Sequence, residues 1–132
     1  MASKQLKTDQ QWREQLSEAQ YHVTRRAGTE APFSGQYVNH NEKGLYLCVC
    51  CDRPIFSSAD KFNSSCGWPS FSAQAEQGLI SHHVDHSLGM DRTEVRCQNC
   101  DAHLGHIFDD GPTLTGLRYC INSIALSFNG DD

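Results

Sequence analysis

The chain has 132 residues, the usual size of one domain, and we expect a single domain over residues 1–132. Hydrophobic residues make up 38% of the chain and charged residues 20%, which excludes an intrinsically disordered protein. The formal net charge of −5 argues against nucleic acid or an anionic membrane as a partner, because both carry negative charge.

The longest apolar run covers residues 45–51 and is too short to cross a bilayer, and no signal peptide is visible. We therefore expect a cytoplasmic protein, and a monomer by default. In that compartment the seven cysteines are expected to act as metal ligands and catalysts, and not as structural disulfides.

Two short helices are predicted in an N-terminal arm, within residues 8–27. Thr8 and the glutamine three residues later have the spacing of a capping box. Trp12 and Leu16 lie four residues apart and so share one helical face. Ser17 begins a second capping pattern. We expect this arm to be a small helical cover packed on a sheet.

From residue 35 to residue 128 the pattern becomes that of short strands, which predicts a mainly β, antiparallel core. The candidate segments are bounded by glycine, proline, asparagine or aspartate and lie near residues 36–39, 45–49, 79–84, 92–97, 102–107 and 117–128. In the last of them, Ile124, Leu126 and Phe128 alternate with small residues, as in a half-buried strand.

Two CxxC turns indicate a metal site. Cys48 and Cys51 form the first turn and Cys97 and Cys100 the second, and both turns read C-x-x-C-D-x-x-apolar. Two such turns can complete a tetrahedral cage of four thiolates, which is typical of structural zinc. Redox or merely buried cysteines are the alternative interpretation, and iron is a possible metal with four sulfurs. The sequence assigns no role to Cys50, the extra thiol inside the first turn.

The cysteines outside the metal set include two candidate redox residues, Cys120 and Cys66. Arg118 and Asn122 lie two residues to either side of Cys120 and so share its face of a predicted strand. A cation beside a cysteine favours the thiolate, so we expect a lowered pKa at Cys120. Cys66 lies among glycine and proline, in a loop where a thiol could reach a second one. A buried structural cysteine is the alternative at position 120.

His103 and His106 are candidate proton donors. They follow the second metal turn directly, and Gly105 between them could bend the segment so that both rings face one pocket. Histidine is the usual acid near neutral pH. A second histidine cluster, at residues 82–86, is interpreted as a set of surface residues.

Three stretches carry a resemblance to a known family: residues 66–71 (CGWPSF), 96–108 (RCQNCDAHLGHIF) and 118–123 (RYCINS). With them the chain resembles the B-type peptide methionine sulfoxide reductases, the class that acts on the R epimer. The resemblance covers residues 9–128, nearly the whole chain.

The resemblance implies specific roles. The catalytic set would be Cys120 (nucleophile), Cys66 (resolving), His106, His103, Asn122 and Arg118. Trp68, Phe71 and Asp110 would bind substrate, and Cys48, Cys51, Cys97 and Cys100 would hold one structural Zn²⁺. The implied fold is a zinc-stapled β-tent, two antiparallel sheets leaning together.

The reaction that the resemblance implies is the reduction of methionine-R-sulfoxide in proteins to methionine. It would pass through a sulfenic acid at Cys120 and a Cys66–Cys120 disulfide, with thioredoxin as the reductant. A zinc-ribbon-like binding module without catalysis is the alternative, and a general thiol oxidoreductase is a second one. The binding module has no need of a cysteine between Arg118 and Asn122, and a thiol oxidoreductase usually places both redox cysteines in one CxxC.

Overall fold

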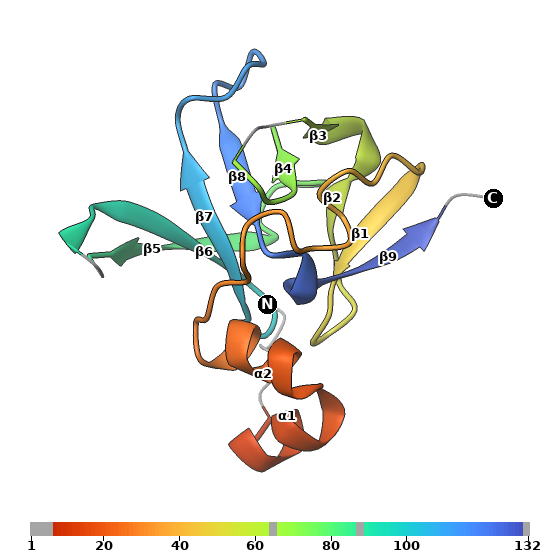
Figure 1. Cartoon of the computed structure of the whole chain (residues 1–132), viewed down its shortest axis with the longest axis vertical. Coiled ribbons are helices and arrows are strands. Elements are labelled where there is room, and N and C mark those ends of the chain that lie inside the picture. The colour runs from red at the N-terminus through yellow and green to blue at the C-terminus, as the bar shows by residue number, and fades with distance from the viewer. Residues whose placement is uncertain (1–6, 64–65, 87–88, 131–132) are drawn as a thin grey trace.

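Two antiparallel sheets and a helical arm make up the structure, a computed structural model that describes residues 7–63, 66–86 and 89–130 (Figure 1). The smaller sheet has the strand order β2-β1-β9, with β1 at Gly44–Cys48, β2 at Pro54–Ser57 and β9 at Leu126–Gly130. The larger sheet has the order β3-β4-β8-β7-β6-β5. Its strands are β3 (Lys61–Phe62), β4 (Ser70–Phe71), β5 (Ile80–Asp85), β6 (Arg92–Cys97), β7 (His103–Phe108) and β8 (Arg118–Ile121). The predicted fold class is confirmed.

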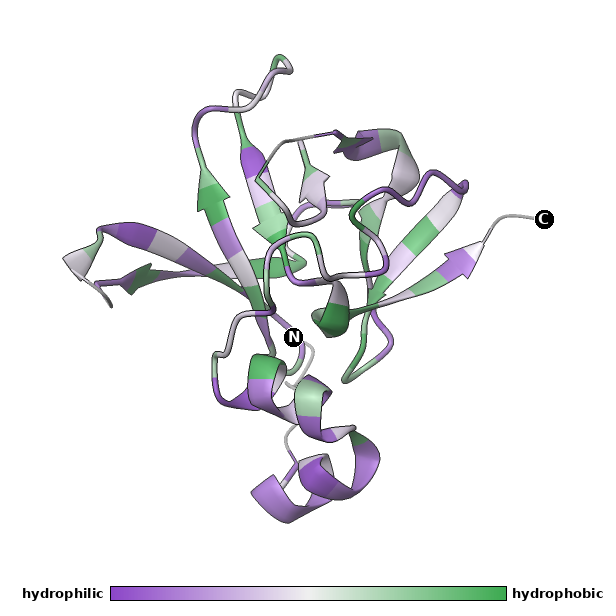
Figure 2. Ribbon diagram, viewed as in Figure 1, coloured by the Kyte–Doolittle hydropathy of each residue, from purple (hydrophilic) through white to green (hydrophobic). Residues whose placement is uncertain are grey.

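The helical arm lies at one end of the two sheets (Figure 1) and consists of α1 (Asp9–Gln15) and α2 (Glu18–Arg25). Both predicted capping boxes are present, at Thr8 and at Ser17, and they fix where the helices begin. Figure 2 shows α1 as almost entirely hydrophilic, so few apolar side chains hold it. Trp12 in the middle of α1 and Leu16 just after it are buried.

The core lies between the two sheets. Phe56 of the smaller sheet stacks on Phe71 of the larger one, with ring centroids 4.3 Å apart and planes at 12°. Both rings are fully buried, as are Tyr46 and Ile121. Within the described ranges, no helix has the length and apolar character needed to cross a membrane.

The strand predictions were wrong in two places. Residues 36–39 form turns and not a strand, since the chain there folds locally with hydrogen bonds such as Val38 N to Gly35 O (3.4 Å). Residues 117–128 form two strands, because a 3-10 turn at Ser123–Ala125 carries the chain from β8 in one sheet to β9 in the other. The alternation of apolar and small residues through Ile124 therefore lies partly in this turn and does not mark one continuous strand. Strands β2, β3 and β4 were not predicted.

Candidate active site and metal centre

Cys120 lies in the middle of the larger sheet, in register with His106 of β7 on one side and Ser70 of β4 on the other. Side chains of directly opposed residues in antiparallel strands point to the same face, so the imidazole and the thiol are neighbours. The Sγ atom of Cys66 lies 3.5 Å from that of Cys120 and 3.5 Å from the Ser70 Oγ. The fold thus brings together two thiols that are 54 positions apart in the chain.

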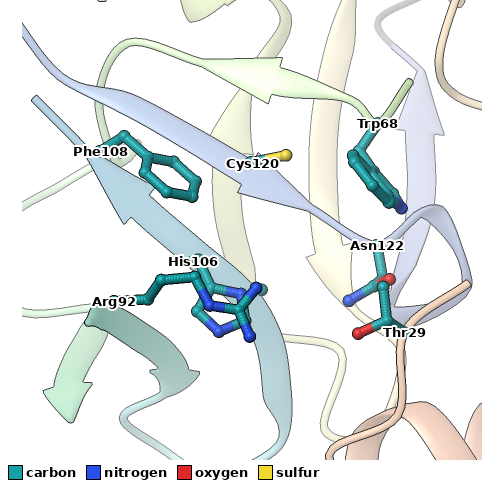
Figure 3. A pocket seen from close by; sticks show the side chains of 8 residues that line it. Thr29, Trp68, Arg92, His106, Phe108, Cys120 and Asn122 are labelled. Atoms are coloured by element: carbon teal, nitrogen blue, oxygen red, sulfur yellow. The ribbon is translucent and has the colours of Figure 1, made fainter. Parts of the chain in front are cut away.

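A pocket opens over Cys120. In the view of Figure 3 the Cys120 sulfur lies between the rings of Phe108 and Trp68, with His106 and Arg92 on one side of it. The residues that line this pocket are Thr29, Trp68, Arg92, Gly105, His106, Phe108, Cys120 and Asn122. Apolar walls beside a thiol and an imidazole suit a small, partly apolar group that undergoes polar chemistry.

Glu30, just after the helical arm, holds two of these lining side chains. Its carbonyl accepts a hydrogen bond from the Trp68 indole Nε1 (3.1 Å), and its backbone N–H donates to the Asn122 Oδ1 (3.0 Å). Its carboxylate accepts the backbone N–H of Ile124 (2.9 Å). The Asn122 amide donates in turn to the Leu104 carbonyl (3.1 Å), so its orientation is fixed by the N-terminal segment and by β7. The N-terminal segment is therefore one wall of the pocket.

The two predicted histidines share one side of β7. The register between β6 and β7 shifts next to Val95, where Val95 pairs with Gly105 and the next residue pairs with His103. This bulge brings the rings of His103 and His106 to a centroid distance of 5.7 Å. Gly105 has a second reason to be glycine, because a Cβ atom there would lie 2.0 Å from the Cys120 carbonyl oxygen.

Each imidazole contacts a carboxylate. The Nδ1 atom of His103 lies 2.6 Å from Oε2 of Glu94, and the Nε2 atom of His106 lies 2.7 Å from Oδ2 of Asp85. Burial opposes the charge of Glu94, but hydrogen bonds from His103 and Arg96 hold the pKa of that carboxyl at about 2. Burial lowers the pKa of His106 and outweighs the opposite effect of Asp85.

The expected lowering of the Cys120 pKa is wrong for the protein in this state. Burial first, and then the neighbouring Cys66, raise the pKa of Cys120 to about 12, against a smaller lowering by Arg118. Arg118 has other contacts, with hydrogen bonds to both carboxylate oxygens of Asp110 (2.8 and 3.3 Å) and its guanidinium over the Phe108 ring. Cys120 is thus a thiol at neutral pH.

Three of the expected site residues, Phe71, His103 and Asp110, do not line the pocket. Phe71 requires a correction: its ring is fully buried in the core against Phe56, and it faces away from Cys120 because it pairs with Tyr119, on the opposite face of β8. His103 is buried and does not line the pocket, and among the described residues its Nε2 atom has no hydrogen-bond partner. Asp110 is largely exposed and contacts Arg118, whose guanidinium lies over the Phe108 ring of the pocket.

Several residues around the pocket were not predicted from sequence. They are Thr29, Glu30, Asp85, Arg92, Glu94 and Phe108, and they come from four separate segments. Phe108 lies inside a stretch that carried the family resemblance, so that signal was present. The others gave no local signal, because strand pairing brings Asp85, Arg92 and Glu94 to the site, and Thr29 and Glu30 reach it from the segment after α2.

The two CxxC turns have the same backbone geometry. In the first, the Cys48 carbonyl accepts the Asp52 N–H at 2.8 Å, and in the second the Cys97 carbonyl accepts the Asp101 N–H at 2.8 Å. Both aspartates have positive φ, 62° and 63°, a left-handed conformation that aspartate tolerates better than most residues. The repeated C-x-x-C-D pattern is therefore a repeated turn.

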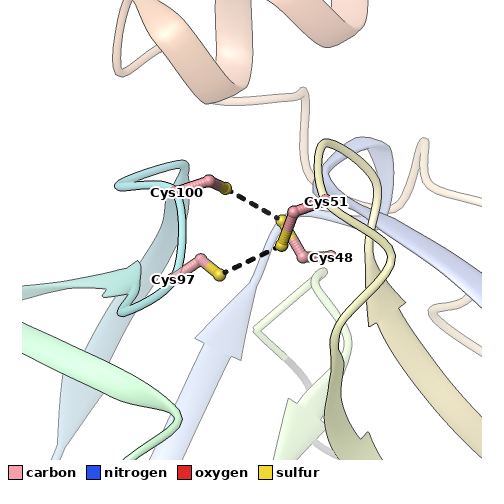
Figure 4. Close-up of side chains that lie close together, drawn as sticks. All are labelled: Cys48, Cys51, Cys97 and Cys100. Carbon is pink, nitrogen blue, oxygen red and sulfur yellow. Dashed lines mark hydrogen bonds between the residues drawn. The ribbon is translucent and has the colours of Figure 1, made fainter. Parts of the chain in front are cut away.

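The four cysteine sulfurs form one cluster between the sheets (Figure 4), with every pair within 4.8 Å. The Cys48–Cys100 and Cys51–Cys97 sulfur distances are both 3.6 Å. A tetrahedron of thiolates at about 2.3 Å from a metal has sulfur–sulfur edges of about 3.8 Å, so the cluster fits a metal ion. The first turn follows β1 and the second joins β6 to β7, so a bound ion would tie the two sheets together.

The helical arm contacts both CxxC turns. The Gln15 amide donates to the Cys50 carbonyl of the first turn (2.6 Å), and the Arg25 guanidinium donates to the Cys100 carbonyl of the second (2.8 Å). The Arg25 guanidinium also lies over the Trp12 ring, 4.4 Å from its centroid. The arm is therefore attached where the two sheets meet.

Comparison with known proteins agrees with this architecture. The SelR domain family matches residues 16–130. A protein of Herminiimonas arsenicoxydans is 54% identical over 129 residues, which cover 98% of this chain and 94% of that protein. A protein of Thioalkalivibrio sulfidiphilus is 59% identical over 121 residues, covering 92% and 88%, and one of Hahella chejuensis is 54% identical over 126 residues, covering 96% and 91%. All three are named peptide methionine sulfoxide reductase MsrB. The chain therefore belongs to the MsrB family of methionine sulfoxide reductases.

Proposed function

We propose that the protein reduces the R epimer of methionine sulfoxide in proteins, with Cys120 as the nucleophile and Cys66 as the resolving cysteine. The observation that carries this proposal is the 3.5 Å distance between the two sulfurs, at the floor of a pocket that contains His106 and Trp68. A disulfide of about 2.05 Å requires the two sulfurs to approach by only about 1.5 Å.

The first step transfers oxygen from substrate to Cys120. The thiol loses its proton to a neighbouring base, and the sulfur attacks the sulfoxide sulfur; the S–S bond made in this attack breaks again when the oxygen moves to Cys120. The oxygen leaves the sulfoxide sulfur only after the oxygen has been protonated. The proton taken from the Cys120 thiol can supply this need if the base passes it on to the oxygen. Thiol and sulfoxide become sulfenic acid and thioether, with two electrons passing from one sulfur to the other. The Trp68 ring supports this step, because an aromatic face suits the S-methyl group.

His106 is the group that we assign to this proton. It lies directly across from Cys120 in the β7–β8 ladder. A thiol whose pKa burial raises to about 12 needs a base beside it, and an imidazole whose pKa burial lowers is neutral and able to accept a proton at pH 7. Asn122 and Arg118 are proposed to orient the substrate and the sulfenic acid.

The second step regenerates the enzyme. The Cys66 thiol attacks the sulfenic acid, water leaves, and a Cys66–Cys120 disulfide forms. We propose that thioredoxin reduces this disulfide by thiol–disulfide exchange. We propose that the protein is cytoplasmic, a compartment that keeps thiols reduced, and that it is a monomer.

We propose Zn²⁺ as the ion of the four-cysteine cluster. Four thiolates at near-tetrahedral spacing are the usual donor set of structural zinc, and they leave no coordination position for substrate. Cys48, Cys51, Cys97 and Cys100 would hold it, and the ion would stabilise the junction of the sheets.

The test uses the two sulfoxide epimers of a blocked methionine separately. The R epimer is expected to be reduced with thioredoxin as the reductant, and the S epimer to remain. Cys120→Ser is expected to form no methionine. Cys66→Ser is expected to form about one methionine per protein and then stop, whereas Cys50→Ala, the matched control, continues to cycle. Thioredoxin-driven cycling by Cys66→Ser, or preference for the S epimer, would refute the proposal.

A further inference from the structure

The Asp85–His106 contact joins a residue of the pocket to a strand that lies outside it. Asp85 is the last residue of β5, the edge strand, and β6 lies between β5 and β7. Even so, the Oδ2 atom of Asp85 lies 2.7 Å from the Nε2 atom of His106. The His106 side chain is 12% exposed and the Asp85 side chain 20%, so water competes little for this contact.

The contact determines which nitrogen of His106 carries its hydrogen. The same Oδ2 atom of Asp85 also lies 3.5 Å from the guanidinium of Arg92, a cation that favours the charged carboxylate. A carboxylate only accepts hydrogen bonds, so the 2.7 Å contact requires the hydrogen on Nε2. In a neutral imidazole the Nδ1 atom is then unprotonated and is an acceptor.

The charges around His106 keep it neutral before substrate reacts. Asp85 approaches from β5, Arg92 and Glu94 from β6, His103 from β7 and Cys120 from β8. Burial, Arg92 and His103 lower the pKa of His106, and Asp85 raises it by less. Asp85 therefore contributes part of the proton affinity of His106 and fixes the ring nitrogen that binds the proton.

We infer that Asp85 is a positioning residue that holds His106 as the Nε2–H tautomer, so that its Nδ1 atom takes the Cys120 proton and passes it to the sulfoxide oxygen. This inference rests on the proposed function. The S–H bond of Cys120 and the sulfoxide S–O bond break, while an S–O bond to Cys120 and an O–H bond form. The thiol loses two electrons and the sulfoxide gains two, so no further reactant is needed. Asp85 stabilises the imidazolium that exists between the two proton transfers.

The test compares the full-length, metal-bound wild type with Asp85→Asn. Nitrogen-15 NMR of the His106 ring is expected to show a protonated Nε2 and an unprotonated Nδ1 in the wild type at pH 7.5. In Asp85→Asn the amide can donate to Nε2, so the protonated fraction of Nδ1 is expected to rise. The rate of the first methionine formation is expected to fall at least about tenfold, with substrate affinity unchanged.

The pH profile gives a second readout that a purely structural residue would not move. Activity in the wild type is expected to fall at acidic pH as His106 becomes protonated. Asp85 raises the pKa of His106, so in Asp85→Asn this fall in activity is expected to occur at lower pH. Asp85→Glu is expected to recover part of the rate. Asp91→Asn is the matched control, because Asp91 also contacts a histidine, His86 at 2.7 Å, but both side chains are exposed. Its rate is expected to equal that of the wild type.

Two results would overturn the inference. One is a protonated Nδ1 in wild-type His106, which needs no variant. The other is a folded Asp85→Asn that keeps the wild-type rate of first turnover and the wild-type pH profile. Failure of the wild type to reduce either sulfoxide epimer would instead refute the proposed function, so the two failures are distinguishable.

Discussion

Gly105 tests whether the close approach of β7 to β8 determines both stability and catalysis. A Cβ atom at this position would lie 2.0 Å from the Cys120 carbonyl oxygen and 3.0 Å from the Cys120 carbonyl carbon. Ordinary contacts of a Cβ atom begin at 3.4 Å, so Gly105→Ala must move the backbone of β8 by about 1.4 Å. Neither backbone is the end of a flexible side chain, so the strain cannot be relieved locally.

We expect Gly105→Ala to lower the free energy of unfolding by about 1–3 kcal/mol, the usual range for overpacking. The first turnover should slow by about 100-fold, because a displacement on the order of 1 Å at reacting atoms has that effect. Urea unfolding and rapid-quench measurement of methionine give the two numbers. Gly78→Ala is the control. Gly78 has a φ of 84°, and no atom of the described residues lies within 4 Å of its Cβ position, so this variant should lose about 1–3 kcal/mol from backbone strain and keep its rate. Wild-type stability and rate in Gly105→Ala would refute the reasoning.

Four further variants test separate parts of the structure. Cys48→Ser should lose the bound metal and the cooperative unfolding transition, since structural zinc contributes on the order of 10 kcal/mol; metal analysis and circular dichroism check this. The pKa of Glu94 is about 2, below its ordinary value of 4.5, so its contribution of about 3 kcal/mol is present above pH 4.5 and is lost as the pH falls toward 2. The stability difference between wild type and Glu94→Gln should therefore shrink across that range in urea titrations. Trp68→Ala should weaken substrate binding by about 2- to 12-fold, measured by calorimetry with Cys120→Ser as background, from the loss of a sulfur–aromatic contact of about 0.3–1.5 kcal/mol. Ser17→Ala should lower the free energy of unfolding by about 1 kcal/mol without changing the rate of methionine formation, because it removes the N-cap of α2.

Local patterns predicted the features that depend on neighbours in the chain. The capping boxes at Thr8 and Ser17 are short-range hydrogen-bond motifs, and both are present. The two CxxC turns were also predicted from sequence, because each turn is closed by a hydrogen bond between residues four positions apart, as at Cys48 and Asp52. The alternation that predicted one strand through Ile124 did not reveal the 3-10 turn, since periodicity carries no information about which sheet a segment joins.

The rest of the site depends on contacts between distant segments. Asp85 and Glu94 approach the histidines through strand register, and a register is set by all the strands of the sheet together. The pKa of Cys120 was mispredicted for the same reason: the Arg118 charge next to it in sequence was visible, but its burial was not. Phe71 lies in a motif that the resemblance associates with substrate, yet its ring is in the core.

The hydrogen bonds of Glu30, which hold one wall of the pocket in place, bear on the biosynthesis of the protein. Its hydrogen bonds reach Asn122 and Ile124, 92 and 94 positions further along the chain. A nascent chain can therefore close this wall only after β8 and the turn that follows it have left the ribosome. Both CxxC turns are made earlier, so the four clustered cysteines emerge before the proposed nucleophile Cys120. Closure of such long loops is slow compared with helix formation, and the pocket should be among the last parts of the molecule to form.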